Sequence, residues 1–193
     1  AFESREDGSG PLEAGAWSVP TLGTRRPQRG RPHVLLVSID TLRADRMSLY
    51  GYARPTTPHL EQWQRSRAVL FEEAQAQAPW TLPSHVSILT GLHPVRHGVN
   101  LDLQASRYAS FANLAMVLRA NGYRTEAITG GGFVHPCFGF ARGFDRYRYW
   151  EGDQDTDHEL EIGVERVLQL FDEDPDSPKF VFLHTYEVHP PNR

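Results

Sequence analysis

Four stretches of the chain have the apolar pattern of β-strands. They cover residues 33–40, 68–74, 124–130 and 179–186. The first of them, HVLLVSID, is a nearly continuous apolar run that ends in an acid. Such a run is typical of a strand that is buried on both faces, as the strands of a parallel sheet are.

Helical patterns occupy much of the chain between these strands. They predict helices over residues 58–67, 83–92, 111–123 and 157–173. The last of these helices carries its apolar residues at helical spacing: Leu160, Val164, Val167, Leu168 and Phe171. Strands that alternate with helices predict an α/β fold with a mostly parallel, doubly wound sheet flanked by helices.

Composition divides the chain into a tail and a domain. Residues 1–31 are rich in Gly, Pro, Ser and charge, which predicts a flexible tail or linker, and residues 32–193 form the domain. The basic segment TRRPQRGRP is either solvated or contacts an anionic membrane or a partner. The net charge of −4 gives no reason to expect nucleic acid, and no apolar run is long enough for a transmembrane segment. A single cysteine, Cys137, excludes an internal disulfide.

The residues that could carry chemistry follow the predicted strands. Asp40 ends the first strand, Thr81 follows the second at the entry to a helix, and His184 and His189 lie at and after the end of the fourth. In open α/β sheets, ligands bind beyond the carboxyl ends of the strands. The topology therefore predicts that these side chains meet at one rim of the sheet.

Each of these residues has a chemical and a structural interpretation. Asp40 is either a ligand for a divalent cation or an aspartate that supports a turn. The Thr81 hydroxyl either caps the helix or, beside helix amides that favour phosphate or sulfate, attacks an anionic centre with the help of a metal. His85, one turn later, contacts the substrate anion or faces solvent. His189 donates a proton to a leaving oxygen or is a surface histidine.

Two long segments resemble the amino-terminal half of a sulfatase-family catalytic domain, in the alkaline phosphatase superfamily. They are HVLLVSIDTLRADRMSLYGYARPTTPHLEQ and APWTLPSHVSILTGLHPVRHGV, and KFVFLHTYEVHPP resembles a later family segment. The resemblance implies an incomplete, alkaline-phosphatase-like fold. It also implies a metal-dependent enzyme that hydrolyses or transfers a sulfate or phosphate ester, with one divalent cation, namely calcium, zinc or manganese. Family habit places such a protein in the periplasm or outside the cell.

The resemblance assigns roles residue by residue. Asp40 matches a metal-binding aspartate, Thr81 the nucleophile that also contacts the metal, and His189 the histidine near the leaving group. Three positions depart from the usual sulfatase pattern. Thr81 replaces the Cys or Ser that is converted to formylglycine, His85 replaces an arginine, and Thr41 replaces a second aspartate. These departures resemble the phosphoethanolamine transferases and phosphodiesterases of the superfamily, which use threonine directly.

The family's remaining metal ligands lie beyond the segment that contains His189. We therefore expect the carboxy-terminal half of the domain to supply them, from the same or a separate chain, and residues 1–193 alone to be inactive and to expose apolar surface. Three functions stay open. They are a sulfatase-like hydrolase with Thr81 as nucleophile, a phosphoethanolamine-type transferase or phosphodiesterase, and a non-catalytic anion-binding relative or inactive fragment.

Overall fold

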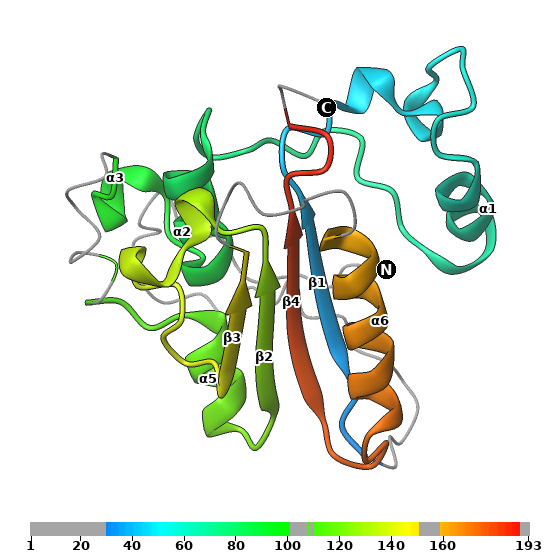
Figure 1. The fold of residues 1–193 in the computed structure, drawn as a ribbon. Coiled ribbons are helices and arrows are strands. Elements are labelled where there is room, and N and C mark those ends of the chain that lie inside the picture. The colour runs from blue at the N-terminus through cyan, green and yellow to red at the C-terminus, as the bar shows by residue number, and fades with distance from the viewer. Residues whose placement is uncertain (1–29, 101–107, 109, 151–158, 190–193) are drawn as a thin grey trace, which may run out of the picture.

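The sheet that the sequence predicts is present and entirely parallel. A computed structural model describes residues 30–100, 108, 110–150 and 159–189, so nearly all of the predicted tail lies outside the described part. Within these residues, four strands form one sheet in the order β1-β4-β2-β3. They are β1 (Val34–Ile39), β2 (Arg124–Thr129), β3 (Arg146–Tyr149) and β4 (Lys179–Thr185). All three pairings are parallel, so the carboxyl ends share one edge (Figure 1).

Three strands match the predicted ones to within one residue at each end, and one prediction is wrong. Residues 68–74 form no strand. Val69 and Phe71 are 70% and 59% exposed, and the Tyr50 hydroxyl donates to the Phe71 carbonyl in place of a strand neighbour. The prediction missed β3, whose sequence RYRY lacks an apolar run because it is an edge strand with exposed arginines.

Five α-helices are described. They are α1 (Pro58–Arg67), α2 (Thr81–Thr90), α3 (Pro94–His97), α5 (Leu114–Ala120) and α6 (Glu159–Asp172). The helix predicted from residue 83 begins two residues earlier, and Gly91 ends it in the left-handed conformation, with a φ of 69°. The helix predicted over 111–123 is shorter because the Asn113 side chain accepts the Met116 N–H at 2.9 Å and so caps it.

Short 3-10 turns complete the described part of the fold. They are η1 (Ala44–Arg46), η2 (Ser48–Tyr50), η4 (Gly132–Val134) and η5 (Pro136–Phe138). Figure 1 shows α1 and its neighbouring turns standing apart from the sheet, beyond its carboxyl edge. None of the described helices has the length and apolar character that crossing a membrane requires.

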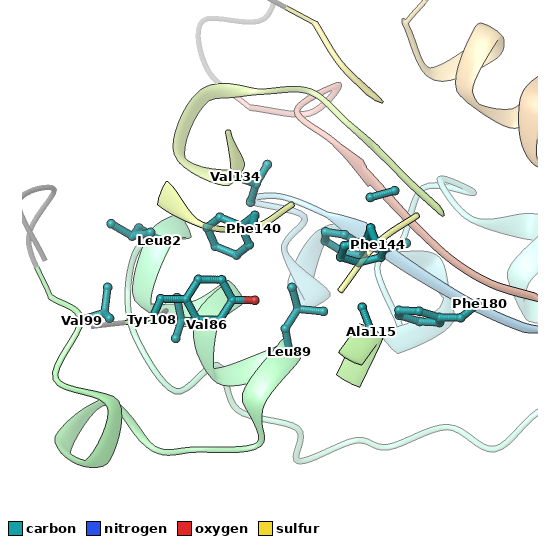
Figure 2. Close-up of a cluster of buried hydrophobic side chains, with 12 residues drawn as sticks. Leu82, Val86, Leu89, Val99, Tyr108, Ala115, Val134, Phe140, Phe144 and Phe180 are labelled. Atoms are coloured by element: carbon teal, nitrogen blue, oxygen red, sulfur yellow. The ribbon is translucent and has the colours of Figure 1, made fainter. Parts of the chain in front are cut away.

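The two faces of β4 explain why the sheet is doubly wound. Phe180 and Phe182 point into a cluster with residues of α2 and α5, while Val181 and Leu183 pack against α6 on the opposite face. Figure 2 shows the first cluster, in which α2 contributes Leu82, Val86 and Leu89. Successive side chains of a strand alternate between its two faces. Because β4 has apolar side chains on both faces, it requires a helical layer on each side.

One face of β1 remains uncovered in the described structure. Leu35, Val37 and Ile39 are 44%, 47% and 38% exposed, whereas Val34 and Leu36 pack against the first cluster. β1 is also an edge strand, so its outer backbone groups have no strand neighbour among the described residues. A free edge beside exposed apolar side chains is the surface that we expect of an incomplete domain.

Candidate active site

The carboxyl end of β1 fixes the position of Asp40. The Asp40 N–H donates to the Thr185 carbonyl at 3.0 Å and so extends the ladder between β1 and β4. Thr41 then turns the chain with a φ of 60°, an unusual value for a non-glycine residue. Its hydroxyl donates to the Val188 carbonyl at 3.1 Å, which ties this turn to the segment that follows β4. The Asp40 carboxylate therefore sits at a rigid corner of the sheet edge.

The Thr81 hydroxyl reaches Asp40 from the start of α2. Trp80 is the N-cap residue, and Thr81 is the first residue of the helix. The Thr81 Oγ1 donates to the Asp40 Oδ2 at 2.9 Å, and Thr81 is only 8% exposed. The hydroxyl is thus directed at the carboxylate and does not cap the helix. The structure brings together the two residues that the sequence analysis places at one rim.

His85 is buried, so the alternative in which it faces solvent is wrong, and its contact with a substrate anion stays a prediction. His85 is 4% exposed, its Nδ1 lies 2.8 Å from the Thr81 carbonyl oxygen, and its Nε2 lies 2.8 Å from the Ser38 Oγ. Because a carbonyl only accepts, Nδ1 carries the proton and Nε2 accepts the hydrogen bond of Ser38. Burial lowers the pKa of His85 to about 4, so the ring is neutral. Both ring nitrogens are therefore already occupied.

Among the described residues, the buried His184 finds no hydrogen-bond partner for either ring nitrogen. It is 1% exposed, and its Nε2 lies 3.5 Å from the Asp40 Oδ2, which is beyond ordinary hydrogen-bonding distance. Burial raises the pKa of Asp40, but the side chains of His184 and Thr81 outweigh this effect, and the net pKa lies below its ordinary value. A buried polar group without a partner indicates a missing ligand, water or ion.

A divalent cation fits the donor atoms around Asp40. One ligand atom from each of Asp40, His85 and His184 lies within 4.8 Å of the others. Because both His85 nitrogens already have partners, the atoms that suit a cation are the Asp40 carboxylate, the Thr81 hydroxyl and a His184 nitrogen. A carboxylate, a hydroxyl and an imidazole are donor groups that divalent cations accept, so the set fits such an ion without fixing which one.

A pocket of about 350 Å³ opens above the Thr81 and Asp40 pair. It is lined by Asp40, Thr41, Pro79, Trp80, Thr81, Gly132, Phe133, Tyr186 and His189. His189 is exposed, and its ring lies edge-on to the Tyr186 ring with 5.3 Å between the centroids. Its backbone N–H donates to the Tyr186 carbonyl at 2.7 Å. The structure thus places His189, Thr81 and Asp40 around one pocket, as the sequence predicts.

The aromatic walls of this pocket were missed by the sequence analysis. Trp80 and Phe133 meet edge to face at 5.2 Å, and the Phe133 N–H donates to the Tyr186 hydroxyl at 3.2 Å. A Cβ on Gly132 would lie 2.9 Å from that hydroxyl, so only glycine allows this approach. The glycine run GGG and the tyrosine two residues after His184 are the only sequence signals that could have pointed to this wall.

Comparison with known proteins identifies the family of the chain. A family model described as Sulfatase matches residues 32–193. Phosphoethanolamine transferase EptC of Escherichia coli K12 is 28% identical over 184 residues, which are 89% of this chain and 30% of EptC. The chain spans less than a third of the curated relatives it matches.

Solved structures show the same fold. The periplasmic domain of Escherichia coli EptC, in complex with zinc, matches with a TM-score of 0.63 at 23% identity, over 85% of this chain and 46% of that one. The phosphonate monoester hydrolase of Agrobacterium radiobacter matches with a TM-score of 0.66 at 22% identity, over 83% and 42%. The described sheet is therefore part of a larger alkaline-phosphatase-like fold.

Proposed function

The chain belongs to the sulfatase family, and we propose that it carries the nucleophile-bearing part of an enzyme that cleaves or transfers a phosphate or sulfate ester. The observation that supports this most directly is the contact of 2.9 Å between the Thr81 hydroxyl and the Asp40 carboxylate. It supports the proposal because the hydroxyl and the carboxylate, which would act as general base, line one pocket beside a candidate cation site.

The reaction that fits this arrangement has two steps. In the first, the Thr81 oxygen bonds to phosphorus or sulfur, its proton passes to Asp40, and the ester oxygen leaves with a proton from His189. A divalent cation bound to Asp40 and Thr81 would lower the pKa of the Thr81 hydroxyl. In the second step, water or an acceptor alcohol attacks the covalent ester and gives its proton to His189, while Asp40 returns a proton to the departing Thr81 oxygen.

The start of α2 supports binding of an anion beside Thr81. Pro83 has no N–H, and the Ser84 N–H donates to the Trp80 carbonyl. Thr81 and Leu82 therefore supply the first-turn amides that the helix itself leaves without an acceptor. The dipole of a ten-residue helix also favours negative charge at this end. Trp80, as the N-cap residue, makes no side-chain hydrogen bond to those amides. An anionic phosphoryl or sulfuryl group in the pocket is therefore stabilised where Thr81 can reach it.

A phosphorus ester is favoured over a sulfate. Threonine carries an extra methyl group and is not a precursor of formylglycine, so Thr81 must react through its own hydroxyl. The likeness to a phosphoethanolamine transferase and to a phosphonate monoester hydrolase supports the same preference. We infer a phosphotransferase or phosphodiesterase reaction as the first to test, and the zinc bound to the EptC domain makes zinc the first metal to supply.

The remaining ligands of the cation are proposed to come from the rest of the domain. Asp40, Thr81 and His184 supply three donor groups, and a hydrolytic metal site requires more protein ligands or solvent. The likeness to a periplasmic domain supports a location in the periplasm or outside the cell. The activity of the whole enzyme therefore depends on sequence that this stretch does not include.

The decisive experiment compares two threonines of α2 in the full-length protein. Turnover of bis(p-nitrophenyl) phosphate, p-nitrophenyl phosphate and p-nitrophenyl sulfate is measured with zinc, manganese or calcium. Thr81→Ala should lower kcat by at least roughly 10³-fold. Thr90→Ala is the matched control, because its hydroxyl donates to the Val86 carbonyl at the other end of the helix.

Mass spectrometry adds a direct readout of the covalent step. Rapidly quenched protein should carry a phosphoryl or sulfuryl group on the peptide that contains Thr81. Undiminished turnover by the Thr81→Ala variant would exclude Thr81 as the nucleophile. Binding of zinc and phosphate without any turnover would favour the non-catalytic anion-binding alternative.

A further inference from the structure

We propose that Tyr186 is a further catalytic residue, whose hydroxyl donates a hydrogen bond to a non-bridging oxygen of the group that Thr81 attacks. This inference rests on the proposed role of Thr81. It means that the aromatic wall of the pocket both shapes the pocket and donates a hydrogen bond to the reacting group.

The end of β4 fixes the ring of Tyr186. Tyr186 directly follows the last residue of β4, and its ring stands edge-on to His184 at 4.6 Å and to His189 at 5.3 Å. It lines the same pocket as Asp40 and Thr81. A ring held between two others has little freedom to swing, so its hydroxyl has a defined position at the pocket wall.

The loop after β2 determines which way the hydroxyl proton points. The Phe133 N–H donates to the Tyr186 oxygen at 3.2 Å and therefore occupies one of its lone pairs. Gly132 lies close to the same oxygen: a Cβ added at this position would be only 2.9 Å from it, so a larger residue would displace the hydroxyl. A backbone N–H cannot accept a hydrogen bond, so the Tyr186 proton is left to find an acceptor on the pocket side.

The pocket that Tyr186 shares with Thr81 is where an acceptor for that proton would bind. Thr81 and Asp40 line the same pocket, and Thr81 donates its own proton to Asp40, so a group that Thr81 attacks lies in the pocket whose wall carries Tyr186. Burial raises the pKa of Tyr186 to about 12, so the phenol remains a donor at neutral pH.

The attack creates the acceptor that this donor faces. When a lone pair of the Thr81 oxygen becomes the new bond to phosphorus, negative charge builds up on the non-bridging oxygens, which lie next to the attacked atom. A fixed donor aimed at that charge contributes most when it is already oriented before the reaction.

The test replaces one hydroxyl and keeps the ring. In the full-length protein, Tyr186→Phe should lower kcat roughly 10²–10³-fold, the loss expected for one oxyanion donor, with little change in KM. Tyr147→Phe is the matched control: that buried hydroxyl donates to the Val134 carbonyl of the same loop. It should retain kcat. A Tyr186→Phe kcat near the wild-type value, or an equal loss in Tyr147→Phe, would overturn the proposal.

A thio substitution separates catalysis from positioning. Sulfur is a weak hydrogen-bond acceptor, so replacing a non-bridging oxygen of the most active probe should slow the wild-type enzyme more than it slows Tyr186→Phe. An equal thio effect in both proteins would mean that the variant only loosens the pocket. Wild-type protein without turnover or a Thr81 adduct would overturn the proposed function as well. If Thr81→Ala is inactive but Tyr186→Phe is fully active, only the role of Tyr186 fails.

Discussion

The buried His85 makes a specific prediction about stability in acid. Its pKa is lowered from 6.5 to about 4 in the folded protein, mainly by burial. The unfolded chain therefore binds the proton more readily, and the folded state loses stability as the pH falls from 6.5 towards 4. For a shift of this size, the loss is about 2 kcal/mol at pH 5 and about 3 kcal/mol at pH 4.

A substitution that cannot titrate isolates this contribution. His85→Asn keeps a donor for the Thr81 carbonyl but leaves Ser38 without its acceptor, which should lower the free energy of unfolding at pH 7.5 by about 1–3 kcal/mol. The deficit relative to wild type should shrink as the pH falls and disappear near pH 5. Ser38→Ala is the control, because it removes one hydrogen bond but retains the imidazole and hence the pH dependence.

Urea unfolding of the full-length protein, followed by tryptophan fluorescence between pH 7.5 and 4.5, provides the measurement. EDTA should be present so that bound metal does not add to the stability. If the unfolding free energies of wild type and His85→Asn change with pH in parallel from pH 7.5 to 5, the prediction that the His85 ring is both buried and neutral is wrong. The tautomer assigned to His85 would then also be wrong.

Two further predictions concern charge. Asp40→Asn removes the carboxylate from the candidate cation site and should weaken zinc binding in calorimetric titration without lowering the thermal midpoint of the metal-free protein; unchanged affinity would place the ion elsewhere. Glu126 is 1% exposed and pairs with arginines from β2, β3 and α6. Glu126→Ala should lower the free energy of unfolding by about 1–3 kcal/mol in urea titration, because three arginines lose a shared buried carboxylate and Arg166 keeps only its pair with Glu173.

The position of Asp40 was predictable because it follows from topology. Once β1 and β4 are recognised as parallel strands, the residues that follow them must appear at one edge, although one face of β1 is more exposed than its apolar run predicts. Thr81 was placed at the same edge partly because of a strand over residues 68–74 that does not form, and only its position at the entry to an apolar helix remains as a correct reason. The observed 2.9 Å contact agrees with the predicted position of both residues.

Burial that depends on neighbours was not predictable. Residues 68–74 have the apolar composition of a strand, but they pair with no strand in the described structure, and Phe71 stays 59% exposed. The converse holds for β3, where Arg146 and Arg148 obscure a real pairing with β2. The amino-acid sequence alone does not distinguish an edge strand with charged side chains from a loop.

The role of His85 was half predictable. A side chain on a helix leans towards the amino end, so a histidine four residues after Thr81 lies over the Thr81 carbonyl. Its second partner, Ser38, comes from a strand 47 residues earlier, and only the fold brings the two together. The same limit hid Tyr186, whose hydroxyl is positioned by the loop that follows β2.

The contact between Asp40 and Thr81 is held from two independent sides. On one side, the Asp40 N–H bonds to Thr185, which fixes the end of β1 to the central strand β4. On the other, His85 hydrogen-bonds both Ser38 of β1 and the Thr81 carbonyl, which fixes the start of α2 to β1. Neither tie involves the exposed face of β1. The Thr81 hydroxyl and the Asp40 carboxylate are therefore preorganised within this stretch of chain, and in the proposed enzyme the rest of the domain would complete a site in which this distance is already set.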